Sequence, residues 1–195
     1  GSTDAAAVLV GVNRMFDLGF TKKELMERGV KLGADVPYCI MRGTALSEGI
    51  GEILTELPAP PQCHLVIAKP QIAVSTKAVY GKLRVNELAP EEHPDIDGMM
   101  AAIKNGDLDG VIERLGNVLE TVTVPDHPEI SEIKEIMVEN GACGSLMSGS
   151  GPTVFGIYKD RELAEKACQA LREADGGRLT RQVYLTEFYN RKKAR

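Results

Sequence analysis

The sequence predicts an α+β protein built in two parts. Several stretches carry apolar residues at helical spacing, while short apolar runs bounded by turn residues favour strands. A proline-rich segment, PAPP at 58–61, can continue neither a helix nor a central strand, so it marks a boundary. We therefore expect the end of one domain at residues 1–58 and a complete α+β domain at residues 63–195.

The composition argues against several classes of protein. The 195 residues can bury an ordinary core, and no apolar run approaches the roughly 20 residues that a membrane span needs. A net charge of −5, from 23 basic and 28 acidic residues, provides no overall positive field for nucleic acid. The basic cluster RKKAR at 191–195 is typical of a solvated tail. We therefore expect neither a membrane nor a nucleic acid as partner.

The cysteines indicate neither a zinc site nor a disulfide framework. They are far apart in the sequence and form no C-x-x-C pair. The four are Cys39, Cys63, Cys143 and Cys168. We expect reduced core thiols in a cytoplasmic protein, or in the plastid stroma if the source is a plant. No secretory signal is visible, and no metal-ligating residue is predicted.

The first part is expected to contain two helices and three short strands. Residues 4–16 are apolar on nearly every face, which favours a helix inside a larger domain whose covering elements are not all in this chain. TKKE fits a capping box with Thr21 as the N-cap of a second helix, which Gly29 or Gly33 ends. The segments VPYCIM, GTALSEG and GEILTELP are predicted to be strands.

The second part is expected to begin with a strand and several helices. CHLVIAK at 63–69 predicts a short apolar strand, and STKAVYGKL predicts a helix with Ser75 or Thr76 as N-cap. Two helical stretches are expected at about 95–105 and 107–120. A further helix over 128–140 follows from the spacing of its apolar residues, Ile130, Ile133 and Met137, and Gly141 would stop it.

The remaining elements predict the topology of the second part. CGSLMS and TVFGIY favour two strands joined by GSGP, RELAEKACQALREA favours an amphipathic helix, and QVYLTEFY at 182–189 favours a last strand. With the extra helices set aside, the order from residue 63 is β-α-β-β-α-β. This is the order of a ferredoxin-like sandwich, which packs two helices on one face of an antiparallel sheet.

Three loops are candidates for chemistry. GST at the start precedes a helix, whose free N–H groups can bind phosphate, although an ordinary Ser or Thr N-cap has the same appearance. LGADVPYC holds Asp35 on a rigid turn, where it could accept a proton or serve the turn alone. MSGSGPTVF at 147–155 joins two strands through small residues, which suits backbone contact with a ligand but also a plain hairpin.

Taken together, four stretches resemble the small-molecule kinases of the GHMP superfamily. They are GSTDAAAVLVGVN, LGADVPYCIMRGTALSEGIGEILTELP, AKPQIAVSTKAVY and LMSGSGPTVFGIY, and the resemblance runs from residue 1 to about 189. The first and last stretches are superfamily features. LGADVP with G-x-G-E, and the K-P-x-I-x-V-S-T segment, are similar to the diphosphocytidyl-methylerythritol kinases within it.

The resemblance implies a function and a set of site residues. Members phosphorylate the 2-hydroxyl of diphosphocytidyl-methylerythritol with ATP and Mg²⁺, in non-mevalonate isoprenoid synthesis. The implied catalytic base is Asp35, and Ala34, Thr76 and Tyr80 would contact the substrate, with Tyr80 stacked on the cytosine. Two glycine-rich loops would bind ATP: Gly1, Ser2 and Thr3 as the end of the phosphate loop, and Ser148, Gly149, Ser150 and Gly151 as the loop that packs beside it.

The resemblance also implies that residues 1–58 are only the remnant of an N-terminal ATP-binding domain. Family members have about a further third of chain upstream, with a catalytic Lys and most of the phosphate loop, so we expect the 195 residues alone to be inactive. That upstream segment is an expected partner, and a homodimer is an open option. Two alternatives remain: a GHMP kinase for another alcohol or sugar, such as homoserine or mevalonate, and a ferredoxin-like binding module without catalysis.

Overall fold

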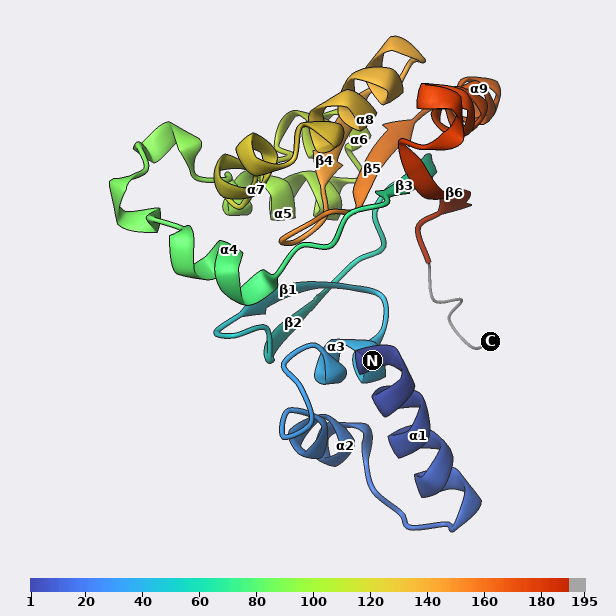
Figure 1. The fold of residues 1–195 in the computed structure, drawn as a ribbon. Coiled ribbons are helices and arrows are strands. Elements are labelled where there is room, and N and C mark those ends of the chain that lie inside the picture. The colour runs from blue at the N-terminus through green and yellow to red at the C-terminus, as the bar shows by residue number, and fades with distance from the viewer. Residues whose placement is uncertain (190–195) are drawn as a thin grey trace. The chain divides into compact units, whose positions relative to one another are not determined.

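The chain forms two compact units, Gly1–Ala59 and Pro60–Phe188. They are seen in a computed structural model that describes residues 1–189, so the basic cluster at 191–195 lies outside the described residues. Figure 1 shows the order of the elements along both units. None of the helices within residues 1–189 is long and apolar enough to cross a membrane.

The first unit consists of three helices and a two-stranded hairpin. Helices α1, α2 and α3 span Ser2–Met15, Lys22–Gly29 and Val36–Met41, and the antiparallel strands β1 and β2 span Thr44–Glu48 and Ile53–Leu57. The capping box at the start of α2 is confirmed, since Thr21 Oγ1 accepts the N–H of Glu24 at 3.3 Å and the Glu24 carboxylate accepts the N–H of Thr21 at 2.8 Å. The small core contains Ala6, Leu25, Val36 and Ile40.

The prediction of a strand at VPYCIM was wrong, because these residues form α3. Pro37 lies in the first turn of α3, where its missing N–H is not needed and its fixed φ favours the helix. Val36 and Ile40 are four residues apart and are both buried in the core of this unit. Helical spacing therefore gives this short apolar segment one buried face.

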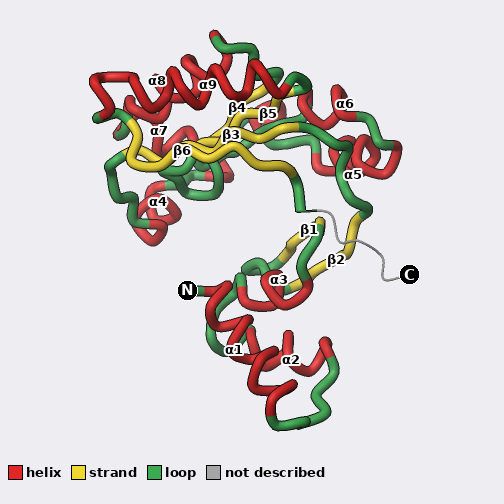
Figure 2. Tube along the Cα trace, turned by 90° about the vertical axis from the view of Figure 1, so that its right-hand side faces the viewer, coloured by secondary structure: helices red, strands yellow, loops and turns green. Residues whose placement is uncertain are grey.

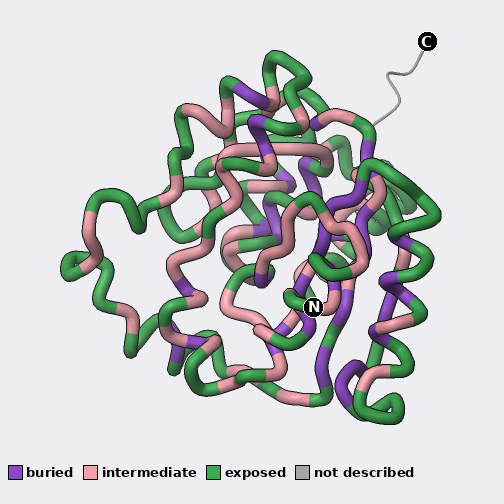
Figure 3. The backbone as a smooth tube through the Cα atoms, turned by 90° about the horizontal axis from the view of Figure 1, so that it is seen from above, coloured by how far each residue is buried: buried purple, intermediate pink, exposed green. Residues whose placement is uncertain are grey.

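The second unit has the ferredoxin-like topology that the sequence predicted. Its sheet has the order β4-β5-β3-β6, all neighbouring strands are antiparallel, and the strands span Gly144–Met147, Val154–Tyr158, His64–Pro70 and Thr180–Glu187 in that order. Helices α8 (Pro128–Glu139) and α9 (Arg161–Glu173) lie on the same side of the sheet (Figure 2). Between α8 and the sheet, Ile130, Ile133 and Met137 are fully buried. Figure 3 shows how buried and exposed residues alternate along the backbone.

Four further helices join β3 to α8. They are α4 (Thr76–Lys82), α5 (Ile96–Asn105), α6 (Leu108–Glu113) and α7 (Glu120–Asp126), with single helical turns at Val85–Glu87 and Pro90–Glu92. A further helical turn, Ala174–Gly177, follows α9. The helix predicted at about 107–120 is therefore too long. It ends at Glu113, and Asn117, four residues further on, donates its side-chain amide to the carbonyls of Met147 and Gly149, contacts that compete with continuation of the helix.

A buried tyrosine ties the sheet to α8, and its removal should lower stability. The hydroxyl of Tyr158, on β5, donates to the carbonyl of Met137 at 3.1 Å, and the residue has no exposed surface. We expect Tyr158→Phe to lower the free energy of unfolding by about 1 kcal/mol, since one buried hydrogen bond is lost while the carbonyl keeps the N–H of Ala142 at 2.9 Å. Calorimetry should show this as a fall in Tm of about 4 °C at pH 8.

The same variant makes a prediction about pH. Burial raises the pKa of Tyr158 above its ordinary value, so the folded state keeps the phenol neutral. The stability gained in this way is present below the unfolded pKa of about 10 and is lost as the pH rises beyond it. The Tm difference between wild type and Tyr158→Phe should therefore shrink between pH 8 and pH 11. Tyr184→Phe, at a residue that is 54% exposed, is the control and should change neither value.

Candidate functional site

Asp35 lies at the start of α3 with its carboxylate exposed. Its backbone carbonyl accepts the N–H of Cys39 at 3.1 Å, but its side chain makes no capping hydrogen bond to the helix. Most Asp residues at this position cap the helix through the side chain. The carboxylate is therefore not engaged in capping the helix.

The turn between β1 and β2 lies against Asp35. A Cβ built on Gly51 would be 3.7 Å from Asp35 Oδ1 and 3.9 Å from the carbonyl oxygen of Ala34. Gly51 has a φ of +114°, and Gly49 has a φ of +71°, which both favour glycine. The Glu52 carboxylate accepts the N–H of Ile50 at 2.7 Å and holds the turn. The absence of a side chain at Gly51 thus keeps the space beside the carboxylate open.

The first turn of α1 lies beside α3 in the same unit. The Thr3 hydroxyl is 3.7 Å from the Cys39 sulfur, one helical turn after Asp35. The first backbone hydrogen bond of α1 runs from the N–H of Ala5 to the carbonyl of Gly1 at 3.0 Å, so the N–H groups before Ala5 have no partner within the helix. The structure therefore brings the start of α1 and the helix of Asp35 together, as the roles expected of Thr3 and Asp35 require.

In the second unit, the small-residue loop 148–151 joins β4 to β5. Ser148 donates its N–H to Thr153 at 2.8 Å, and Gly151 donates its N–H to Ser148 at 3.0 Å. Gly149 and Gly151 have φ values of +58° and +85°. Within residues 1–189, the successive N–H groups of Gly149 and Ser150 have no hydrogen-bond partner. Successive N–H groups in such a turn form a concave site for anions.

Helix α4 brings two further expected site residues to this loop. The hydroxyls of Thr76 and Ser150 are 2.9 Å apart, although 74 residues separate them in the sequence. Tyr80 lies one turn after Thr76 and is 60% exposed. The structure therefore brings Thr76 and the loop together, with an uncovered aromatic ring on the same face of α4.

Three residues that support the loop were missed by the sequence analysis. Asn117 donates to the carbonyls of Met147 and Gly149, Glu120 accepts the N–H of Met147, and Thr123 donates to the carbonyl of Ser150. These bonds span 27 to 32 residues of sequence, so no local pattern indicates them.

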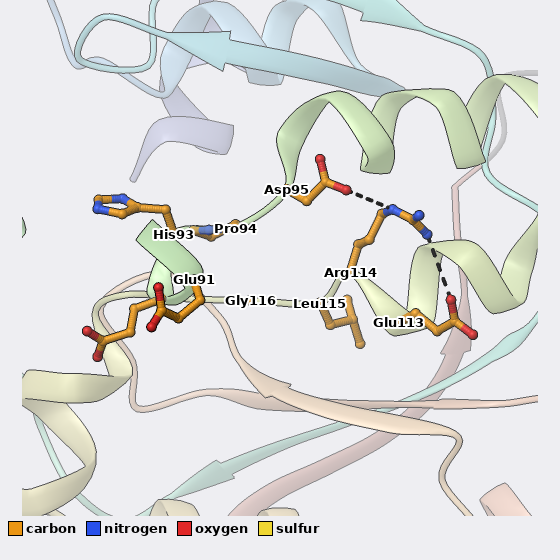
Figure 4. A pocket seen from close by; sticks show the side chains of 9 residues that line it. Glu91, His93, Pro94, Asp95, Glu113, Arg114, Leu115 and Gly116 are labelled. Carbon is orange, nitrogen blue, oxygen red and sulfur yellow. Dashed lines mark hydrogen bonds and ion pairs between the residues drawn. The ribbon is translucent and has the colours of Figure 1, made fainter. Parts of the chain in front are cut away.

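A separate cleft of about 400 Å³ contains none of the expected site residues. Figure 4 shows Arg114 between Asp95, at 3.0 Å, and Glu113, at 3.9 Å. The N–H of Gly98, followed by Arg114, lowers the pKa of Asp95. Arg114 thus pairs with two of the carboxylates that line the cleft, and Glu91 and Glu92 add further negative charge to it. No group of three or more His, Cys, Asp or Glu residues within positions 1–189 could hold a metal ion.

Two family models match the chain and together cover more than half of it. The model of the GHMP kinases N terminal domain matches residues 1–43, and that of the GHMP kinases C terminal domain matches residues 99–176. The chain belongs to the GHMP kinases. In this GHMP kinase the match to the N-terminal model lies within the first compact unit and the match to the C-terminal model lies within the second.

Two curated relatives of this GHMP kinase carry the same name. A 4-diphosphocytidyl-2-C-methyl-D-erythritol kinase of Lachnospira eligens is 55% identical over 97% of the chain, and one of Lachnoclostridium phytofermentans is 50% identical over 98%. The chain spans 64% of the length of each. A crystal structure of 4-(cytidine 5'-diphospho)-2C-methyl-D-erythritol kinase matches 95% of this chain and 63% of its own, with a TM-score of 0.76 and 29% identity.

A homoserine kinase from Cytophaga hutchinsonii has the same fold. Its crystal structure matches 93% of this chain and 64% of its own, with a TM-score of 0.76, but only 22% of the residues are identical. The GHMP kinase fold is therefore shared among kinases of different substrates, so the fold alone does not identify the substrate.

Proposed function

We propose that the protein carrying these residues is a 4-diphosphocytidyl-2-C-methyl-D-erythritol kinase. It transfers the γ-phosphoryl group of ATP to the 2-hydroxyl of the cytidyl substrate, a step of non-mevalonate isoprenoid synthesis. The observation that carries the proposal is the 55% identity over 97% of the chain to a kinase of that name. The proposal concerns the whole protein, because the chain spans only 64% of that relative.

Asp35 is the catalytic residue of the proposed reaction. The substrate oxygen forms a bond to the γ-phosphorus, the bond to the ADP oxygen breaks, and the Asp35 carboxylate takes the hydroxyl proton. The exposed carboxylate without a capping bond and the open space at Gly51 both support this role. Ala34 contributes the backbone carbonyl beside the same space.

The residues assigned to ATP suit an anion. The N–H groups of Ser2 and Thr3, and those of Gly149 and Ser150, are donors for phosphate oxygens, whereas the Gly1 amino group is bonded to the Asp4 carboxylate at 3.0 Å. The hydroxyls of Ser2 and Thr3, at the start of α1, would help to hold a Mg²⁺ ion that accompanies the nucleotide. When bound, this ion neutralises phosphate charge.

We also propose functions for the segment that corresponds to the remaining third of the relatives' length. We assign to it the catalytic Lys and the rest of the phosphate loop. Helix α1 exposes Val8 and Val12, at 63% and 41%, although they lie within an apolar helix. This exposed apolar surface is an argument for a larger domain in which other elements cover α1.

A substrate panel on the whole protein tests the function, with Tyr80 as the probe of the cytidine site. We expect phosphorylation of the cytidyl substrate but not of homoserine or mevalonate. Tyr80→Ala should raise KM for the cytidyl substrate about tenfold, because stacking of a base on an aromatic ring contributes about 1–3 kcal/mol. KM for ATP should not change, and Tyr80→Phe, which keeps the ring, should behave as wild type. Preferred phosphorylation of another alcohol would refute the proposed substrate.

A further inference from the structure

The side chain of Asn117 holds the loop that follows β4. Its Nδ2 donates to the carbonyls of Met147 and Gly149, both at 2.8 Å. Its Oδ1 accepts the N–H of Leu119 at 3.0 Å. Both the nitrogen and the oxygen of the amide therefore make hydrogen bonds. The nitrogen donates to two carbonyls that are two residues apart, at the end of β4 and in the loop after it.

These bonds determine which way the loop's peptide groups face. In a planar trans peptide the carbonyl and the following N–H point in opposite directions. With the Gly149 carbonyl directed at Asn117, the N–H of Ser150 is directed away from it. The Met147 carbonyl turns the N–H of Ser148 in the same way, but that group already donates to Thr153 at 2.8 Å. The N–H of Ser150 is therefore oriented by Asn117 and donates to no described residue.

The strand end before the loop is held separately. The Glu120 carboxylate accepts the N–H of Met147 at 2.7 Å and pairs with Lys134 at 2.6 Å. The side chain of Glu120 is only 19% exposed, so this anchor is shielded from solvent. Loss of the Asn117 amide should thus release the Gly149–Ser150 peptide without freeing the end of β4.

We propose that Asn117 is a positioning residue for phosphoryl transfer, which aims the N–H of Ser150 at a phosphate oxygen of the nucleotide. This inference rests on the proposed function in assigning the loop to ATP. An asparagine suits the position because it offers two donors and one acceptor on a short side chain. An aspartate of the same shape would place one carboxylate oxygen, in the position of Nδ2, against both carbonyl oxygens and turn the peptides away.

Asn117→Asp in the whole protein tests the inference. Calorimetric titration with a non-hydrolysable ATP analogue should show about tenfold weaker binding, the scale of one or two lost hydrogen bonds. KM for ATP should rise similarly, while KM for the cytidyl substrate changes less than twofold. Asn140→Asp is the matched control. Asn140 donates to the carbonyl of Ile136 at 2.8 Å in the same unit, but before β4 rather than after it, so both KM values should stay at wild type.

Each outcome decides the inference. ATP-analogue binding within twofold of wild type in Asn117→Asp overturns it, as does an equal loss in Asn140→Asp, which would indicate general destabilisation. If Asn117→Asp does not fold, Asn117→Ala is judged by the same comparison, with an expected loss of about fivefold. Phosphorylation of a different alcohol by the wild type would refute only the proposed substrate, because ATP binding still reports on Asn117. A wild type that binds no ATP would refute both.

Discussion

Replacement of Asp35 by Asn in the whole protein is expected to lower kcat by about 100-fold or more, as for the loss of a general base. The amide has the shape of the carboxylate but cannot take the proton of the substrate's hydroxyl. The fold should survive, because the carboxylate is exposed and does not cap α3. Steady-state release of ADP at saturating concentrations of both substrates measures kcat, and thermal unfolding checks the fold.

Asp17→Asn is the control for this substitution. Asp17 is exposed in the turn after α1 and has a φ of +48°, a conformation that Asn also tolerates. The control should keep wild-type kcat and Tm. An Asp35→Asn enzyme with full turnover would remove Asp35 from the mechanism, and a large fall in its Tm would assign it a structural role instead.

Local patterns were sufficient for most of the second unit. The spacing of Ile130, Ile133 and Met137 predicts one buried helix face, and all three are fully buried on α8. The order of strands and helices along the chain then restricts the topology to the split β-α-β unit, since connections are short and neighbouring elements pack together. The pairing of β3 with both β5 and β6 agrees with that order.

Short apolar segments were the weak point of the sequence analysis. Six residues such as VPYCIM fit a buried strand and a buried helix equally well, and packing of Val36 and Ile40 into one core decides for the helix. Helix α7 (Glu120–Asp126) was not predicted, for a related reason. A tertiary hydrogen bond from Asn117 to the loop after β4 competes with helix continuation, and the sequence near Asn117 carries no sign of its distant partner.

The residues that hold the small-residue loop could not be predicted from the sequence. The resemblance to a family suggested Thr76 and Ser150, and the 2.9 Å between their hydroxyls agrees with a shared site in the second unit, though their roles stay a prediction. Asn117 and Glu120 lack any motif, because they act on backbone groups and not on a ligand. Every residue has backbone N–H or carbonyl groups, so the sequence does not show which of them a distant side chain will bind. Such contacts are seen only in the structure.

A large side chain at Gly51 should abolish turnover by covering Asp35. The Cα–Cβ direction at Gly51 leads toward Asp35 Oδ1, which a Cβ would approach to 3.7 Å. We expect Gly51→Leu in the whole protein to lower kcat/KM for the cytidyl substrate at least 100-fold, because the added atoms occupy the space that the reacting hydroxyl needs. The φ of +114° at Gly51 adds strain, which should reduce the free energy of unfolding by about 1–3 kcal/mol.

Gly43→Leu separates strain from obstruction. Gly43 has a φ of +92°, in the same glycine-favouring range, but a Cβ there would meet nothing within 4 Å. The two variants should therefore lose stability to a similar degree in thermal unfolding, while Gly43→Leu keeps kcat/KM within about threefold of wild type, as expected for a change that leaves the reacting groups in place. Equal losses of activity in Gly51→Leu and Gly43→Leu would mean that backbone strain, and not steric obstruction of Asp35, inactivates the enzyme. Retained activity in Gly51→Leu would place the reacting hydroxyl elsewhere than beside Asp35 Oδ1.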